Sequence, residues 1–268
     1  MINLIPMAGR GNRFFQEKYK LPKPFIPTLG SPMFQMAIKS FPRADKYVFI
    51  CLKEHLQKFS PQNIFGNAVK NSEFIVLDEV TQGQACTCLL AEKYFKKDEG
   101  LFIASCDYQM IYDEKKYQKL LNDKTVDVII WTFKIGTIKK ADPKAFAYCR
   151  MDGERVIEVV EKRTISDDPF NDPAVVGSFT YRNSELFVKG AKEMIKKNIR
   201  VNNEFYVGTS INQLIEQGCR VVAFEIDKFI SFGTPFELAS AHYWQEYFDQ
   251  LEDHPYSMNY GYKSRSMS

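Results

Sequence analysis

Residues able to bind phosphate follow the first apolar run of the chain. Ile2–Met7 is predicted to be a buried strand, and Ala8-Gly9-Arg10-Gly11-Asn12-Arg13-Phe14 comes directly after it. Glycines let backbone N–H groups approach phosphate oxygens, and a loop after a first parallel strand lies at the edge where α/β proteins bind ligands. The guanidinium of Arg13 adds N–H donors in a fork geometry that matches a phosphate group. The segment predicts a phosphate-binding loop, although a Gly-x-Gly pair alone would equally fit a tight turn.

A lysine between two prolines follows in Leu21-Pro22-Lys23-Pro24. Each proline restricts φ, so the backbone around Lys23 is stiff and its ammonium can be positioned in advance against an anion. A solvated lysine in a Pro-rich turn fits Lys23 alone equally well. Two familiar phosphate loops are excluded. Phe14 stands where the dinucleotide fingerprint needs Gly or Ala, and the Gly-Lys-[Ser/Thr] of a Walker loop is absent.

Asp107 follows the predicted strand 101–105 and could offer a hard oxygen to a metal ion. A turn aspartate or a helix N-cap would also fit Asp107 alone. The three histidines form no H-x-x-x-H pattern and the six cysteines form no C-x-x-C pair. We therefore expect neither a zinc site nor a disulfide framework.

The composition is that of an ordinary globular protein with nearly balanced charge. The 268 residues include 36 Lys plus Arg and 33 Asp plus Glu, which gives a net charge of +3, and 45% are hydrophobic. This balance argues against a nucleic-acid-binding protein, and no apolar run approaches the ~18 residues of a membrane span. The N-terminus lacks the pattern of a signal peptide, so we expect a cytoplasmic protein without nucleic-acid or membrane partners.

Strand and helix patterns alternate through the first half of the chain. This alternation predicts a three-layer, Rossmann-like α/β fold, with helices on both faces of a mixed, mostly parallel sheet. The predicted strands are 2–7, 47–52, 74–78, 101–105 and 126–134, and the helices between them include 84–96 and 115–122.

The second half begins with an inserted β-hairpin, because Asp152-Gly153 favours the positive φ of a tight turn. Gly218 is expected to end one helix, and Thr234, Pro235 and Glu237 form a capping box that opens the last helix. The predicted strands here are 145–151, 156–162, 175–181, 219–224 and 228–232, and the helices are 184–197, 209–217 and 234–251.

The order of these motifs resembles that of the nucleotidylyltransferases that make activated sugars and alcohols. No single stretch is specific, but their joint order over roughly residues 1–240 is typical of that family. The stretches that carry the resemblance are 8–14, 21–24, 78–85, 104–107, 160–162, 175–179, 203–206 and 232–235.

The resemblance implies roles for individual residues. Arg13 and Lys23 would be catalytic, because all reactants are anions and transfer requires neutralisation and positioning. Asp107 would bind Mg²⁺, the expected cofactor. Lys162 would meet the acceptor phosphate, although a surface lysine at a hairpin end fits it alone. The implied nucleotide-binding residues are Met7, Ala8, Gly9, Arg10, Gly11, Asn12, Gln82 and Gly83, and the implied acceptor-binding residues are Glu161, Lys162, Gly177, Asn203 and Glu204.

The chain departs from the family at its second metal-binding aspartate, which is Ser231 here. Asp227 stands four residues earlier on the same strand face, but roughly 13 Å away at about 3.3 Å per residue. Either Asp107 and the phosphates hold the metal, or water and Ser231 fill the gap.

The sequence gives only weak information about which nucleotide and which acceptor the protein would use. Ala8-Gly9 resembles the cytidylyltransferases and some uridylyltransferases, which favours CTP. The whole chain looks like the small nucleotidylyltransferases of capsule biosynthesis, among them the CTP:phosphoglutamine cytidylyltransferases. The resemblance thus implies a nucleoside triphosphate and a phosphorylated small molecule (a sugar phosphate, polyol phosphate or phosphoglutamine) as substrates for capsule or surface polysaccharide synthesis.

Other functions stay open at this point. One is a UTP- or dTTP-dependent sugar-1-phosphate nucleotidylyltransferase. A metal-dependent glycosyltransferase would more often show Asp-x-Asp, which Asp107-Tyr108-Gln109 lacks, and a non-catalytic regulator is supported only by the missing aspartate.

We expect one domain over 1–251, with a nucleotide-binding part over about 1–140, an acceptor-binding part over about 141–230, and a tail at 252–268. A homodimer is left open.

Overall fold

The computed structural model describes residues 1–57, 71–137 and 142–251. It divides into two compact units, each assembled from segments distant in sequence. Unit 1 contains Met1–Gly9, Phe41–Ser105 and Met110–Phe229, and unit 2 contains Arg10–Ser40, Cys106–Gln109 and Ile230–Ser268. The nucleotide-binding part over about 1–140 and the acceptor-binding part over about 141–230 stay predictions. The single domain over 1–251 stays a prediction, and the predicted tail at 252–268 lies outside the described residues.

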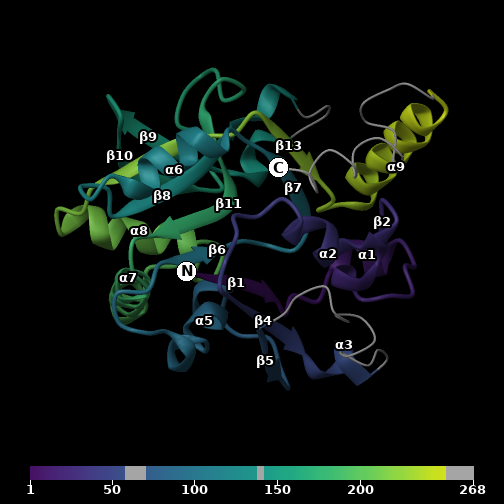
Figure 1. Ribbon diagram of the computed structural model, residues 1–268, viewed down its shortest axis with the longest axis horizontal. Coiled ribbons are helices and arrows are strands. Elements are labelled where there is room, and N and C mark those ends of the chain that lie inside the picture. Colours follow the sequence, from purple (N-terminus) through teal and green to yellow (C-terminus); the bar gives the residue numbers. More distant parts are fainter. Residues whose placement is uncertain (58–70, 138–141, 252–268) are drawn as a thin grey trace. The chain divides into compact units, whose positions relative to one another are not determined.

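Unit 1 is built on a nine-stranded sheet (Figure 1). Two of its strands, β10 and β11, run against the direction of the others, so the sheet is mixed and mostly parallel, as predicted. The strand order is β5 (Ser72–Leu77), β4 (Lys46–Leu52), β1 (Ile2–Met7), β6 (Leu101–Ile103), β11 (Pro173–Tyr181), β8 (Val128–Lys134), β12 (Val221–Glu225), β10 (Arg155–Glu161) and β9 (Ala147–Asp152).

Neighbouring residues of β11 show that helices cover both faces of this sheet, because successive side chains of a strand point to opposite sides. Tyr181 packs against Phe187 of α7 (Ser184–Lys196), with 5.6 Å between ring centroids. Thr180 lies 3.2 Å, oxygen to oxygen, from the hydroxyl of Tyr117 on α6 (Glu114–Asn122). The predicted three-layer α/β fold is confirmed. Unit 1 also contains α3 (Lys53–Gln57), α5 (Gln84–Leu89), α8 (Val207–Glu216) and the 3-10 turns η3 (Glu92–Tyr94), η4 (Ile135–Thr137) and η5 (Pro143–Ala145).

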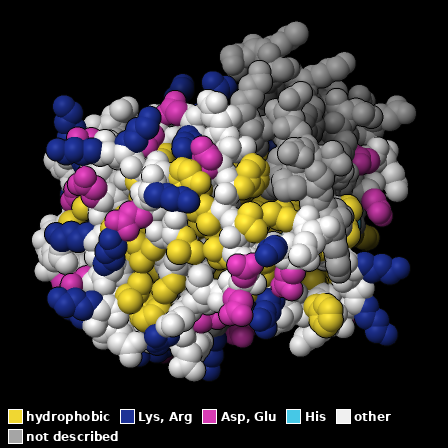
Figure 2. All heavy atoms as spheres, turned by 90° about the horizontal axis from the view of Figure 1, so that it is seen from below, with side chains coloured by type: hydrophobic (Ala, Val, Ile, Leu, Met, Phe, Trp, Pro, Cys, Tyr) yellow, Lys and Arg dark blue, Asp and Glu magenta, His cyan; other side chains and the backbone are white. Residues whose placement is uncertain are grey.

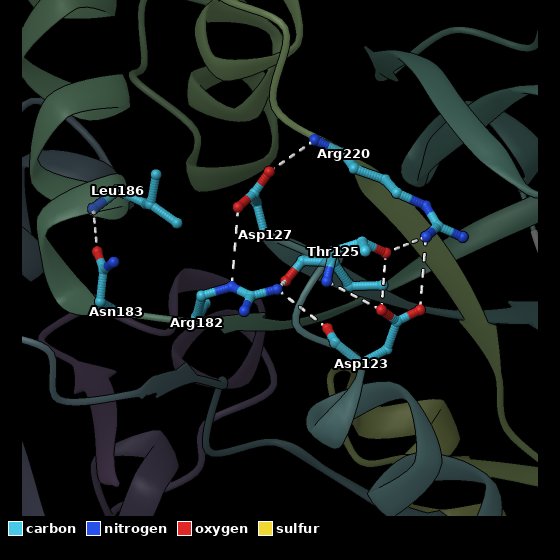
Figure 3. Close-up of polar contacts among 8 residues, drawn as sticks. Asp123, Thr125, Asp127, Arg182, Asn183, Leu186 and Arg220 are labelled. Atoms are coloured by element: carbon cyan, nitrogen blue, oxygen red, sulfur yellow. Dashed lines mark hydrogen bonds and ion pairs between the residues drawn. The ribbon is translucent and has the colours of Figure 1, made fainter.

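A polar network ties together the ends of three strands of unit 1 (Figure 3). Asp127 precedes β8, Arg182 follows β11 and Arg220 precedes β12. The Arg220 backbone N donates to Asp127 Oδ2 at 2.8 Å, and Arg182 Nε lies 3.8 Å from Asp127 Oδ1. Arg220 Nη1 also lies 3.4 Å from Asp123 Oδ2. Because β8 and β12 begin here, the network holds their register at the edge opposite the carboxyl ends of the parallel strands.

Unit 2 packs several short elements and the 15-residue last helix around a small apolar core. Thr234 caps the last helix as predicted, since its Oγ1 accepts from the Glu237 backbone N at 3.2 Å. The core cluster consists of Phe14, Ile26, Met33, Met36, Phe232 and Leu238. The elements are α1 (Asn12–Gln16), η1 (Lys23–Phe25), β2 (Pro27–Thr28), β3 (Ser31–Pro32), α2 (Met33–Ile38) and α9 (Pro235–Asp249), and the paired strands β7 (Tyr108–Ile111) and β13 (Lys228–Ser231) begin or end in this unit.

The turn predictions hold, and one helix prediction is wrong in length. Gly153 has φ 56 in the β9–β10 hairpin, and Gly218 has φ 85 directly after Gln217, the C-cap of α8. The helix predicted over 84–96 ends at Leu89, because the N–H groups of Leu90 and Ala91 bond three residues back, to the carbonyls of Thr87 and Cys88. Thr and Cys have low helix propensity, which is consistent with the early end of α5.

The surface shown in Figure 2 carries acidic and basic side chains interspersed, without a block of one sign. This agrees with the near-zero net charge. Within the described ranges, no helix is both long enough and apolar enough to cross a membrane.

Candidate active site

A cavity of unit 2 gathers several of the predicted phosphate-binding residues. Gly11 has the left-handed φ of 64° directly before α1, and a Cβ there would lie 3.0 Å from Lys23 Cβ. Only glycine therefore lets the loop approach this lysine so closely. Phe14 is buried in the core whereas Arg13 is exposed, so α1 is anchored by the ring and leaves the guanidinium accessible. The cavity measures about 260 Å³ and is lined by Gly11, Asn12, Arg13, Phe14, Lys23 and Gly233.

Lys23 and Asp107 form an ion pair, with Nζ 2.5 Å from Oδ2 and side-chain exposures of 19% and 20%. Lys23 is therefore not a solvated surface lysine. Burial by itself lowers the pKa of Lys23, but the charge and hydrogen bond of Asp107, together with Cys106, more than offset this, so the pKa is raised; the Arg13 guanidinium opposes the increase. The ammonium stays charged at neutral pH. Asp107 precedes β7 and no helix begins there, so the helix N-cap alternative is wrong.

Three side-chain oxygens face the backbone of Gly233. A Cβ on Gly233 would lie 3.3 Å from Ser231 Oγ, 3.3 Å from Glu237 Oε2 and 3.5 Å from Asp107 Oδ2. Thr234 Oγ1 donates to Glu237 Oε2 at 2.9 Å and holds that carboxylate in place. The sequence pattern indicates only Ser231 as a substitute for the second aspartate, and the structure adds Glu237.

This donor set fits Mg²⁺, which takes hard oxygen ligands and is usually bound by one or two carboxylates together with substrate phosphates. In the part of the chain that the structure describes, no group of three or more His, Cys, Asp and Glu side chains could hold a metal ion. Phosphate oxygens and water would have to complete the coordination.

The predicted nucleotide-binding loop that contains Gln82 and Gly83 is held in unit 1 by the backbone of Phe205. Phe205 N donates to the Gln82 carbonyl at 3.0 Å, and Ala85 N donates to the Phe205 carbonyl at 2.9 Å. Gly83 lies between these bonds with φ 133, and a Cβ there would lie 2.4 Å from Phe205 N. This position therefore requires glycine. Asn203 and Glu204 belong to the turn directly before Phe205, so the structure brings this nucleotide-binding loop and the predicted acceptor-binding turn into contact.

Glu161 and Lys162 lie at the end of β10, next to the first turn of α8. A Cβ on Gly208 would lie 2.5 Å from Glu161 Oε1, so this carboxylate packs directly on the helix. Lys162 has φ 56; its ammonium donates to the Ala145 carbonyl and lies 5.7 Å from the centre of the Tyr206 ring. Lys162 is half-buried, which argues against an ordinary surface lysine.

Burial raises the pKa of Glu161 to about 7, against the opposing effect of Lys162. The folded protein therefore keeps the Glu161 proton up to about pH 7, whereas the unfolded chain releases it near pH 4.5. The free energy of unfolding consequently falls as pH rises from about 4.5 to 7.

Glu161→Gln should remove this pH dependence of the free energy of unfolding, which amounts to at most about 3 kcal/mol. Relative to wild type, the variant should gain stability between pH 5 and pH 8 in urea unfolding. An equal difference at both pH values would contradict this, and exposed Glu154→Gln is the control.

The structure gives less information about the remaining predicted site residues. Gly177 has φ 96 in a bulge of β11, between Val175 and Phe179, and its place in an acceptor pocket stays a prediction. Met7 and Ala8 are buried at the end of β1, while Gly9 and Arg10 are exposed. Their contacts with nucleotide also stay predictions.

Arg200 is a candidate that the sequence pattern does not indicate. It stands in a polar turn after α7, and nothing in its spacing distinguishes it from other basic residues. Its Nη2 donates to Gln82 Oε1 at 2.6 Å and its Nη1 to the Asn203 carbonyl at 3.2 Å. Arg200 thus bonds both predicted substrate loops of unit 1.

Comparison with protein families identifies the class. The family model described as nucleotidyl transferase matches residues 2–246, and the chain belongs to that family. It is therefore a nucleotidyltransferase enzyme. Comparison with the curated proteins gave no match.

Solved structures of similar fold include a nucleoside-diphosphate-sugar pyrophosphorylase from Vibrio cholerae RC9, with 21% identity, a TM-score of 0.73 and coverage of 90% of this chain and 99% of that one. The inositol-1-phosphate CTP transferase from T. maritima has 15% identity, a TM-score of 0.69 and coverage of 91% and 93%. An apo UDP-glucose pyrophosphorylase has 17% identity, a TM-score of 0.67 and coverage of 91% and 98%. At these identities the likeness establishes the fold.

Proposed function

We propose that this enzyme transfers the cytidylyl group of CTP to a phosphorylated small molecule and releases pyrophosphate. The observation that carries the proposal is the cavity of unit 2, where Arg13 and Lys23 meet the Gly11–Asn12 loop and Asp107 pairs with Lys23. A small cavity with two converging cations suits a triphosphate. Acyl-transfer or redox chemistry would not need this arrangement.

The reaction needs charge stabilisation more than proton transfer. An acceptor phosphate oxygen attacks the α-phosphorus of CTP, the bond between that phosphorus and the bridging oxygen breaks, and pyrophosphate leaves. A phosphate monoester has its second pKa near 6, so the nucleophile is already ionised at neutral pH and no general base is required. Lys23 would neutralise charge at the α-phosphate, and Arg13 with the amides of residues 9–12 would hold the departing pyrophosphate.

Mg²⁺ would supply further neutralisation of the triphosphate, and Asp107, Ser231 and Glu237 are the residues that would hold it. The Lys23 ammonium lies against Oδ2 of this same Asp107 carboxylate. Adding EDTA should therefore abolish pyrophosphate release, and excess Mg²⁺ should restore it. Undiminished turnover in EDTA would contradict a metal-dependent reaction.

The acceptor would bind in unit 1, against Glu161, Lys162 and the Asn203–Glu204 turn. The Lys162 ammonium would bind the acceptor phosphate there. Ala8-Gly9 supports CTP as the nucleotide, and the acceptor would be a phosphorylated sugar, polyol or amino-acid derivative. A product of this kind would serve capsule or surface polysaccharide synthesis.

The direct test is to incubate the enzyme with each nucleoside triphosphate and a panel of phosphorylated acceptors while measuring pyrophosphate. We expect release only when CTP and an acceptor are both present. Preference for UTP or dTTP would overturn the cytidylyl assignment and leave nucleotidyl transfer intact. Release of nucleoside diphosphate would indicate a glycosyltransferase instead.

A further inference from the structure

Arg200 of unit 1 is held more firmly than is usual for an exposed arginine. Its Nε donates to Asn198 Oδ1 at 2.7 Å, its Nη1 to the Asn203 carbonyl at 3.2 Å and its Nη2 to Gln82 Oε1 at 2.6 Å. The guanidinium also lies 4.0 Å from the centre of the buried Phe205 ring. Three nitrogens of the Arg200 guanidinium thus donate hydrogen bonds and one of its faces lies against an aromatic ring, which fixes the plane of the guanidinium.

This arrangement determines how the Gln82 carboxamide is oriented. A guanidinium has only donors, so it must bond the carbonyl oxygen of Gln82, and the amide nitrogen is turned away from Arg200. The Gln82 backbone is fixed separately, because its carbonyl accepts from Phe205 N at 3.0 Å. Gln82 is therefore held at both its backbone and its side-chain oxygen, and the exposed end of the side chain offers N–H donors.

A fixed pair of N–H donors distinguishes pyrimidine bases. Cytosine presents two neighbouring acceptors, N3 and O2, whereas uracil and thymine carry a hydrogen on N3. A freely rotating carboxamide could turn its oxygen toward that N3–H, but Arg200 already binds this oxygen. We propose that Arg200 is a positioning residue for nucleotide specificity, which makes Gln82 favour a cytosine over a uracil or thymine base. The inference rests on the proposed function, with the predicted nucleotide-binding residue Gln82 taken as the residue that contacts the base.

The test measures dissociation constants for CTP and UTP by calorimetry without any acceptor, so it does not depend on knowing the second substrate. Wild type should bind CTP at least tenfold more tightly. Arg200→Met keeps the stem but removes all donors, and should reduce this ratio by about tenfold, the effect of about one hydrogen bond. Gln82→Glu presents only acceptors and should reverse the preference. Arg155→Met, at an exposed position of the β9–β10 hairpin, should leave the ratio unchanged.

A merely structural role for Arg200 would weaken both nucleotides equally, so an unchanged CTP:UTP ratio in Arg200→Met would overturn the inference. A wild-type preference for UTP would also overturn it. If no nucleoside triphosphate binds at all, the proposed function fails and the inference fails with it. If CTP binds and supports pyrophosphate release but the ratio is unaffected, only the inference fails.

Discussion

Lys23→Met is expected to lower turnover by about 10²- to 10³-fold, the usual cost of removing one group that stabilises charge in the transition state. Asp107→Asn should have an effect of similar size, because the carboxylate is the proposed ligand for the metal and the partner of Lys23. Steady-state rates of pyrophosphate release, measured at saturating CTP, check both variants. Wild-type rates in either would contradict the assignments.

Substituting both members of the Lys23–Asp107 ion pair together provides the control for misfolding. Each single substitution leaves the other charge partly buried without its partner, and should lower the free energy of unfolding by about 1–3 kcal/mol. The double variant, Lys23→Met with Asp107→Asn, removes both charges and should recover much of that stability while remaining inactive. A double variant that regains turnover together with stability would show that the pair is structural.

Gly83→Ala should have the second large effect, because the new Cβ would meet backbone and not a movable side chain. It would lie 2.4 Å from Phe205 N and 2.7 Å from Phe205 O, at a φ of 133° that L-residues rarely adopt. Both backbone hydrogen bonds that join the Gln82 loop to Phe205 should break. We expect a loss of about 2–4 kcal/mol in unfolding free energy and at least tenfold weaker CTP binding.

Gly153→Ala separates backbone strain from this clash. Gly153 also has a positive φ, 56°, but a Cβ there would meet nothing within 4 Å. The control should cost only about 1 kcal/mol and leave CTP binding unchanged. Equal effects of the two substitutions on CTP binding would mean that the Gly83 contact does not position the nucleotide loop.

Elements with strong periodicity or clear termini could be predicted from sequence. The β1 strand, Ile2–Met7, matches its prediction at both ends because a continuous apolar run marks a buried strand. The start of α9 was set by the capping box of Thr234 and Glu237, and the hairpin by Asp152-Gly153. In each case the signal lies within a few residues of the feature it predicts.

Features that depend on distant contacts could not be predicted in this way. The turn η1 is too short to show a period, and the Lys23–Asp107 pair spans 84 positions. The Arg200–Gln82 bond spans 118 positions and involves an arginine that local sequence does not distinguish. The sequence pattern identifies Glu237 as a capping residue, but its approach to Ser231 and Asp107 depends on how unit 2 folds around Gly233.

Labelled CTP shows directly whether the α-phosphate of CTP passes to the acceptor, as we propose. With ³²P at the α-position we expect a labelled acceptor product, and with ³²P at the γ-position all label should appear in pyrophosphate. Both conversions should slow by about 10²- to 10³-fold in Asp107→Asn. Label from the γ-position on the acceptor would reveal a kinase, and CTP consumption without any labelled acceptor would mean hydrolysis. Either result would contradict nucleotidyl transfer from CTP.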